Sequence, residues 1–210
     1  MVHSTRPGLI IGFHGCDQHV KDALIGKGLR MNPSVKSHDW LGNGCYFWEN
    51  NYERALDFAK NPPGKKTIKH PTVLGAVIEL QFCLDLLDTT FLNMVKDAYT
   101  RLSAAAGQFN LELPVNKTIG QSNDLLIRNL DCAVIEYVHK GRIEENRKPF
   151  DSVRGVFVEG EELYPGAGFN AKNHIQLCVR NPNCIKGFFN PLEEIQWPQI
   201  EQSYKQSMQN

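Results

Sequence analysis

The amino-acid sequence predicts an α+β fold, and three observations lead to this prediction. Short apolar strands and amphipathic helices alternate in the first part of the chain, two helices follow, and three strands end it. Helices therefore gather in the first two thirds and strands in the last third. This segregation is typical of α+β proteins, whereas a doubly wound sheet needs strands and helices to alternate throughout.

Composition excludes several functional classes. The 210 residues are 41% hydrophobic and 22% charged, which is ordinary for a globular protein, and 23 basic residues balance 23 acidic ones. A net charge of zero gives no overall attraction to nucleic acid or to an anionic membrane, although a local patch would not appear in this sum. No apolar run is long enough to span a bilayer, and the N-terminal residues lack the apolar core of a signal peptide. The six scattered cysteines form no C-x-x-C pair, so we expect a reducing, cytoplasmic location without disulfides and no metal site.

The first elements lead to a glycine-rich stretch. Residues 8–14 are an apolar run that predicts a buried strand. Asp17 is suited to cap a helix over residues 18–27, and Gly28 is suited to end it. Residues 30–41 are polar and predict a loop.

The stretch from Trp40 to Trp48 combines a turn with aromatic residues. Gly42 and Gly44 let the backbone turn sharply and approach another group closely. The residues that follow, 45–48, favour a strand and carry flat rings. This arrangement suits a pocket that sandwiches a planar ligand, and it is also typical of a buried hairpin with aromatic packing.

The middle of the chain is mainly helical. A helix over residues 51–60 is followed by a Pro- and Gly-containing break and then by a clear buried strand over 72–82. Helices over 84–105 and 122–141 carry apolar residues at helical spacing, which indicates a role in the core. The break also contains a small basic loop, which is either a solvated turn or a phosphate contact. Its residues are Lys65, Lys66, Lys69 and His70.

Strand patterns return near the C-terminus. We expect a single domain over residues 1–190, with a helical insertion at about 84–141 and a polar tail over 191–210. The predicted strands cover residues 152–159, 173–180 and 184–189.

Three blocks of this sequence resemble the ADP-ribosyltransferase superfamily. They are Phe13-His14-Gly15, the motif Gly42-x-Gly44-x-Tyr46-Phe47, and the strand containing Gln176 together with residues 184–188. The resemblance is to the branch of poly(ADP-ribose) polymerase catalytic domains and diphtheria-type toxins, which carries a His, a Tyr and usually a Glu on three separate strands. It covers the first and last parts of the chain and leaves the middle helices unmatched.

The resemblance implies a split β-sheet with flanking helices, and NAD bound in its cleft as a co-substrate. His14 would hold the adenosine-side ribose, and the backbone of Gly15 would bond the nicotinamide carboxamide. Tyr46 would stack on the nicotinamide ring, and Gly44 would lie against the cofactor. The spacing of a second stacking ring points to Asp57, so we expect Phe58, one residue later, to take that place.

Two positions depart from the family pattern. Arg54 and Ala55 stand where the family has a small hydroxyl residue, and Gln176 stands where it has the glutamate. A carboxylate stabilises the positive charge that develops on the ribose when nicotinamide leaves, whereas Gln keeps only a hydrogen bond. The loss of one well-placed electrostatic group costs on the order of 10²–10³ in rate. We therefore expect a single transfer rather than polymer growth.

His174 lies two residues before Gln176, so both side chains share a face of the strand. His174 is either a surface histidine or a group that positions or deprotonates the acceptor. The preceding loop, residues 160–172, is where the family contacts its target. Candidate residues there are Tyr164, Phe169 and Lys172, and Glu159, Glu161 or Glu162 is a possible substitute for the missing glutamate.

The resulting hypothesis is an NAD-dependent mono-ADP-ribosyltransferase. It would release nicotinamide and transfer ADP-ribose to a macromolecular acceptor, protein or nucleic acid, as a toxin or defence effector with an inhibitory partner protein. The alternative is a catalytically weak module that binds NAD or ADP-ribose. Transfer of an RNA 2′-phosphate to NAD, a third possibility, favours a more basic pocket than this neutral chain offers.

Overall fold

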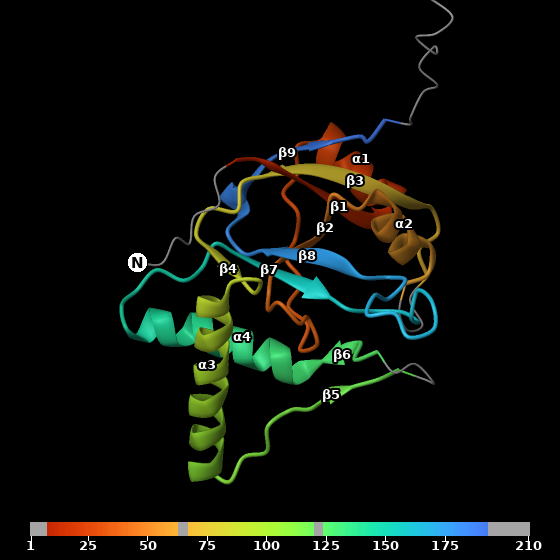
Figure 1. The fold of residues 1–210 in the computed structure, drawn as a ribbon. Coiled ribbons are helices and arrows are strands. Elements are labelled where there is room, and N and C mark those ends of the chain that lie inside the picture. Colours follow the sequence, from red (N-terminus) through yellow and green to blue (C-terminus); the bar gives the residue numbers. More distant parts are fainter. Residues whose placement is uncertain (1–7, 63–66, 120–123, 193–210) are drawn as a thin grey trace, which may run out of the picture.

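A computed structural model describes residues 8–62, 67–119 and 124–192 and confirms the α+β class (Figure 1). Its centre is a seven-stranded mixed sheet with the strand order β4-β7-β8-β2-β1-β3-β9. Neighbouring strands are antiparallel except β4 and β7, which are parallel. The elements in chain order are β1 (Ile10–Asp17), α1 (Gln18–Gly26), β2 (Cys45–Glu49), α2 (Tyr52–Lys60), β3 (Pro71–Ile78), β4 (Cys83–Asp85), α3 (Thr89–Gln108), β5 (Asn116–Lys117), β6 (Ile127–Arg128), α4 (Asn129–Glu144), β7 (Ser152–Phe157), β8 (His174–Val179), a 3₁₀ turn (Pro182–Cys184) and β9 (Ile185–Phe189).

Helices cover both faces of the sheet. On one face, Leu24 of α1 packs against Cys16 and Leu74. On the opposite face, α2 packs through Ala55 against Trp48, and α3 and α4 cover the neighbouring part of the sheet (Figure 1). Of the helices in the described ranges, none combines the length and the hydropathy needed to cross a bilayer.

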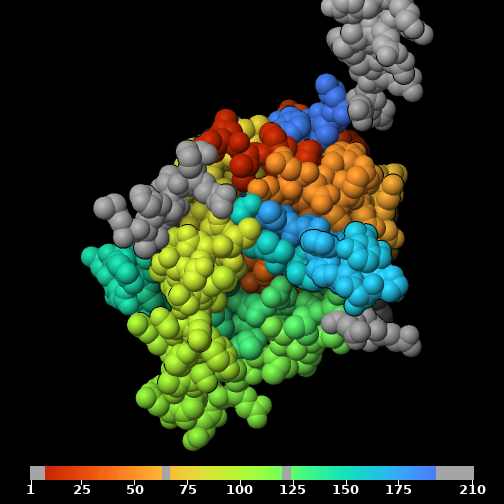
Figure 2. Space-filling model, in the orientation of Figure 1, coloured from red at the N-terminus to blue at the C-terminus, as the bar shows by residue number. Residues whose placement is uncertain are grey.

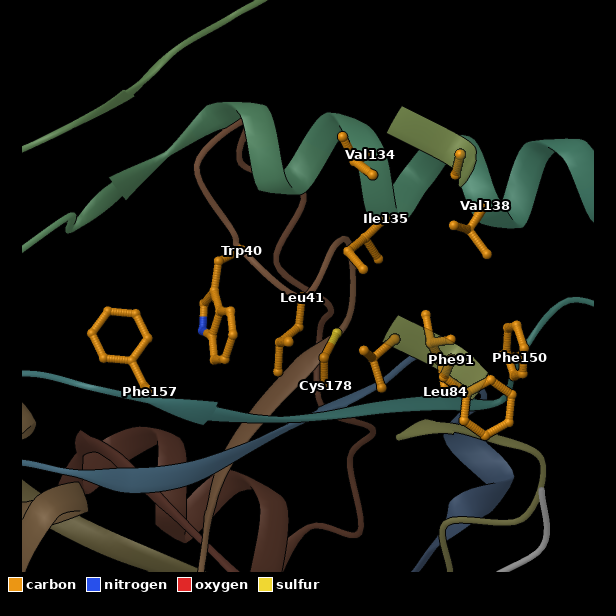
Figure 3. Packing of buried hydrophobic residues seen from close by; sticks show 12 residues of the cluster. Trp40, Leu41, Leu84, Phe91, Val134, Ile135, Val138, Phe150, Phe157 and Cys178 are labelled. Carbon is orange, nitrogen blue, oxygen red and sulfur yellow. The ribbon is translucent and has the colours of Figure 1, made fainter. Parts of the chain in front are cut away.

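The largest core cluster lies between α4, α3 and the strands β7 and β8. Trp40 and Leu41 reach into it from the loop before β2, between Phe157 and Cys178 (Figure 3). A large hydrophobic contact therefore fixes the start of the glycine-rich stretch against the sheet.

Polar caps begin three of the helices. The side chain of Asp17 accepts a hydrogen bond from the His19 amide at the start of α1, as the sequence predicts. Asn51 caps α2 and Asp88 caps α3 in the same way. These caps set the points at which the chain leaves a strand or loop and enters a helix.

The middle of the chain differs from the prediction. The run expected as one helix from residue 84 first completes the short buried strand β4, because residues 83–85 pair in parallel with β7. Asp88 then starts α3, so Leu87 precedes the helix and is exposed. The second helix begins at Asn129 rather than at residue 122, because residues 127–128 pair with residues 116–117 as β6 and β5.

Some predictions lie outside the described residues. Lys65 and Lys66 of the basic loop fall there, and so does the predicted C-terminal tail beyond Leu192. All six cysteines are buried.

Candidate functional site

The strands that carry the three family-like residues are neighbours in the sheet. His14 is on β1, Tyr46 on β2 and Gln176 on β8, and the sheet order places β2 between the other two. Trp48 pairs with Gln176, and Tyr46 pairs with Cys178. Cross-strand partners share a face, so Tyr46 and Gln176 lie on the same face of the sheet.

His14 lies where β1 and β2 separate. The two strands pair Gly12 with Glu49 and Phe13 with Trp48, and their register ends there. The His14 ring then enters the gap, and its Nδ1–H donates to the carbonyl oxygen of Tyr46 at 2.8 Å. A side chain thus takes the place of a strand-to-strand hydrogen bond and holds the two strands apart.

The backbone of Gly15 faces this gap. The Asn50 amide donates to the carbonyl of Ile11 at 3.0 Å, so the polar backbone groups of Ile11 point toward β2. Along a strand, every second residue points its N–H and C=O to the same side. Gly15 is four residues after Ile11, so its N–H and C=O also point toward β2. One donor and one acceptor therefore face the opening beyond the last β1–β2 pair.

A pocket of about 410 Å³ adjoins the opening. It lies between α1, the loop over residues 29–34 and the start of β2, and this volume is in the usual range for small-molecule sites. His14, Gly44 and Tyr46 line it on the sheet side. Apolar residues of α1 and both apolar and polar residues of the loop complete the lining, among them Val20, Leu24, Arg30, Met31, Asn32 and Ser34.

The glycine turn has strict steric requirements. Gly42 has a φ of +80°, a backbone conformation that residues other than glycine rarely adopt. A Cβ on Gly44 would lie 2.7 Å from the carbonyl oxygen of Val179, so only glycine lets the turn rest on β8. The predicted role of Gly44 against a cofactor stays a prediction, although the residue does line the pocket.

The Tyr46 hydroxyl closes this turn on itself. It donates to the carbonyl of Gly42 at 2.7 Å and accepts from the amide of Leu41 at 3.0 Å. Burial raises the pKa of the phenol far above its ordinary value. The hydroxyl is therefore neutral and structural, and it fixes the plane of the ring.

An ion pair anchors the other side of the turn. Glu136 of α4 accepts from the amide of Asn43 at 2.8 Å, and Arg180 donates to the Asn43 carbonyl at 3.0 Å. Arg180 also pairs with Glu136. The turn is thus held from both the helix and the sheet.

Trp40 orients the amide of Gln176. The indole Nε1–H donates to Gln176 Oε1 at 2.6 Å. Because the oxygen is turned toward Trp40, the NH₂ group points elsewhere and offers donors rather than an acceptor. The contact between Trp40 and Gln176 cannot be predicted from the sequence, because 136 residues separate them and only the fold brings them together.

The structure does not place Phe58 opposite Tyr46. Phe58 packs on Trp48, with ring centroids 5.0 Å apart, in the cluster beneath α2. Tyr46 packs against the Trp40 cluster instead. A sandwich of these two rings around a ligand would therefore need a movement of α2.

His174 is buried, at 6% exposure, and is not a surface histidine. Its ring stacks on Phe157 and lies against Trp48. Nδ1–H donates to the carbonyl of Lys172 at 2.7 Å. Burial, assisted by the charge of Arg54, lowers the pKa of His174 to about 4, so the ring is neutral near pH 7.

The loop after β7 is tied to α2. Arg54 pairs with Glu159 at 2.8 Å, and Lys172 pairs with Asp57 at 3.4 Å. Glu159 is thus engaged, and the two other candidate carboxylates of the loop are exposed. Tyr164 and Phe169 are exposed as well.

Two further groups are separate from this arrangement. Arg154 of β7 pairs with Glu49 at 2.6 Å and with Asp85. Within the described ranges, no group of three or more His, Cys, Asp or Glu side chains is placed to hold a metal ion.

Comparison with known proteins leaves the family open. No protein-family model and no solved structure matches the chain. The sequence is 22% identical over 209 residues to an uncharacterized protein of Methanocaldococcus jannaschii, covering 91% of this chain and 88% of that protein. The similarity extends over nearly the whole length of both chains and assigns no function.

Proposed function

We propose that this protein is an NAD-dependent mono-ADP-ribosyltransferase with an ADP-ribosyltransferase-like split sheet. The observation that carries the proposal is the opening between β1 and β2. There the polar backbone groups of Gly15 face the gap, His14 and Tyr46 border it, and a pocket of about 410 Å³ adjoins it. In this proposal the protein acts in the cytoplasm, modifies a macromolecular acceptor and serves as a toxin or defence effector.

The two ends of NAD would occupy different parts of this opening. The adenosine end would lie in the pocket beneath α1, with His14 at the ribose. The carboxamide of nicotinamide has one acceptor and one donor, which complement the N–H and C=O of Gly15. The ring of Tyr46, held by its hydroxyl, would support the nicotinamide plane.

In the reaction, the bond between ribose C1′ and the nicotinamide nitrogen breaks, and the electron pair leaves with nicotinamide. The ribose then carries positive charge. Gln176 lies on the Tyr46 face of the sheet, where it would contact the ribose hydroxyls. Because it brings no negative charge, we expect slow turnover.

Release of nicotinamide from labelled NAD tests the site. We expect Tyr46→Ala to abolish release, because it removes both the stacking ring and the bonds that close the turn. Tyr99→Ala on α3 is the matched control, since Tyr99 is exposed and α3 carries none of the proposed site residues. Release that continued unchanged in Tyr46→Ala would contradict the assignment.

The second candidate is a module that binds NAD or ADP-ribose with little turnover, and the Trp40 contact favours it. Trp40 holds the oxygen of Gln176 on its own side, so the amide turns its NH₂ donors toward a ribose hydroxyl. In Gln176→Glu, one carboxylate oxygen would still accept from Trp40, and the other would face the ribose. A transferase should then gain on the order of 10²–10³ in nicotinamide release. A module built for binding would hold NAD equally well and release no nicotinamide in either form.

A further inference from the structure

Three buried nitrogen atoms lie around the junction of β2, α2 and β8. They are Nε1 of Trp48, Nε of Arg54 and Nε2 of His174, and each is without a hydrogen-bond partner among the described residues. The rings of Trp48 and His174 are 6.1 Å apart, and the charge of Arg54 acts on His174. Buried polar atoms without partners are rare, so three of them at one junction make it a candidate site for a polar group.

The hydrogen-bonding character of each atom is fixed. The indole Nε1–H of Trp48 and the Nε–H of Arg54 can only donate. His174 uses Nδ1–H to reach the carbonyl of Lys172, so Nε2 of the neutral ring carries a lone pair and accepts. The junction therefore presents two donors and one acceptor.

A hydroxyl group complements this set. Its hydrogen would donate to His174, and its oxygen has lone pairs for Trp48 and Arg54. A carboxylate fits less well, because its lone pairs would repel the lone pair of His174 Nε2. An ammonium group also fits less well, because its positive charge would repel the guanidinium of Arg54. We propose that this junction is the acceptor site of the transferase and that it binds the hydroxyl of a serine or threonine side chain of another protein; this rests on the proposed function.

The junction lies beside the proposed ribose site. Trp48 is the cross-strand partner of Gln176, and His174 is two residues from Gln176 on the same face, about 7 Å along the strand. As the bond from C1′ to nicotinamide breaks, the hydroxyl oxygen would give up its contact with Arg54, use that lone pair to form the bond to ribose C1′, and keep its contact with Trp48. The hydroxyl proton passes to His174 Nε2 and then to water.

The surrounding loop favours a protein over a nucleic acid. The exposed glutamates at positions 161 and 162, which have no part in the Arg54–Glu159 pair, would repel phosphates. The exposed side chains of Leu163, Tyr164 and Phe169 offer apolar contacts that a polypeptide can use. The loop covers the junction through the pairs Arg54–Glu159 and Lys172–Asp57, and it lies against α2 at the surface (Figure 2). An acceptor reaches the three nitrogens when this loop moves away from α2.

The first experiment does not depend on turnover. The full chain is titrated with N-acetylserinamide and, as a control, with N-acetylalaninamide, both with and without NAD. The indole N–H resonance of Trp48, assigned from Trp48→Phe, reports binding. We expect a shift with the serine compound alone, and equal or absent shifts for the two compounds would overturn the site. A shift with the serine compound, combined with absent NAD binding, would instead contradict the proposed function.

The second experiment follows transfer to a serine-containing peptide. We expect Trp48→Phe and His174→Gln to lower the ratio of transfer to nicotinamide release, His174→Gln on the order of 10²-fold. His139→Gln is the control, because His139 is also buried without a partner among the described residues but lies on α4. An unchanged ratio in both variants would overturn the proposal. So would a product that neutral hydroxylamine cleaves, which marks a carboxyl ester, or a label in extracts that nuclease removes and protease does not.

Discussion

Gly15 lies where the backbones of β1 and α2 come into contact. A Cβ at this position would lie 2.0 Å from the carbonyl oxygen of Ala55, which is far inside van der Waals distance. Gly15→Ala must therefore push α2 away from the sheet, and we expect it to destabilise the fold by about 3 kcal/mol or more. Urea unfolding measures this loss.

Gly26→Ala is the matched control for Gly15→Ala. It lies at the end of α1, where an added Cβ meets nothing within 4 Å, so we expect stability to stay equal or to rise by up to about 1 kcal/mol. Equal stability of the two variants would show that α2 does not press on Gly15.

Two buried histidines make stability depend on pH. Burial lowers the pKa of His174 to about 4 and that of His139 to about 3, with Arg54 assisting at His174 and Arg180 and Arg142 at His139, where Glu136 opposes. Above pH 6.5, neither the folded nor the unfolded state binds these protons. As the pH falls below 6.5, the unfolded chain takes them up first, so the folded state loses stability down to the folded pKa values. Between pH 7 and pH 5 we expect a loss of about 2 kcal/mol for each histidine.

Urea unfolding of His139→Leu at the same two pH values separates these contributions. The substitution removes one of the two titrating groups, so the loss between pH 7 and pH 5 should be about half that of the original protein. A loss of the original size would show that His139 does not contribute.

At the residue level, the sequence predicted the strands and elements of most site residues but not their partners. His14, Tyr46 and Gln176 stand in recognisable local contexts, so they could be found by motif. Trp40 and Arg54 have ordinary local contexts, and their bonds to Gln176 and Glu159 depend on segments more than one hundred residues away. Spacing predicts that Phe58 lies opposite Tyr46, whereas the Phe58 ring packs on Trp48 because both belong to the core beneath α2.

At the level of elements, the Tyr46 hydroxyl holds one side of the turn before β2, and the Glu136–Arg180 pair holds the other. Tyr46→Phe removes the bonds to the Gly42 carbonyl and the Leu41 amide but keeps the aromatic face. We expect a loss of about 1–3 kcal/mol in stability, because buried backbone groups lose their partner. We also expect NAD binding to persist, in contrast to Tyr46→Ala. Calorimetric titration with NAD and urea unfolding measure the two effects, and lost binding in Tyr46→Phe would mean that the hydroxyl itself contacts the ligand.

Elements of five or more residues carry a local apolar pattern that predicts them. The bounds of α1, α2, β2, β7, β8 and β9 lie within two residues of the predicted ones, whereas β1 ends three residues later than predicted and β3 four residues earlier. The strands β4, β5 and β6 have two or three residues each, which is too short for a period to appear. Pairing with distant segments defines them, and this information is absent from a local pattern.

At the level of the whole molecule, strand order is what assembles the site. The sequence separates β2 from β8 by more than one hundred residues, and the sheet makes them neighbours. The order could not be predicted from the strands themselves, because each apolar strand could pair with several others. The separation of β1 from β2 depends on their other neighbours. β1 pairs with β3 over eight residue pairs, and β2 pairs with β8, so each strand keeps the direction of its own partner.

An opening inside a sheet lowers stability, and a ligand that fills it should restore some of it. If NAD bridges β1, β2 and α1, it stabilises the folded state by about 2.7 kcal/mol at one hundred times its dissociation constant. For a chain of this size, that corresponds to a rise in melting temperature of about 5–10 °C. Adenosine alone should fill the pocket under α1, and nicotinamide alone should slow hydrogen exchange at the Gly15 amide. Thermal unfolding and exchange measurements with each compound test this division, and an unchanged melting temperature at millimolar NAD would remove the basis for NAD as co-substrate.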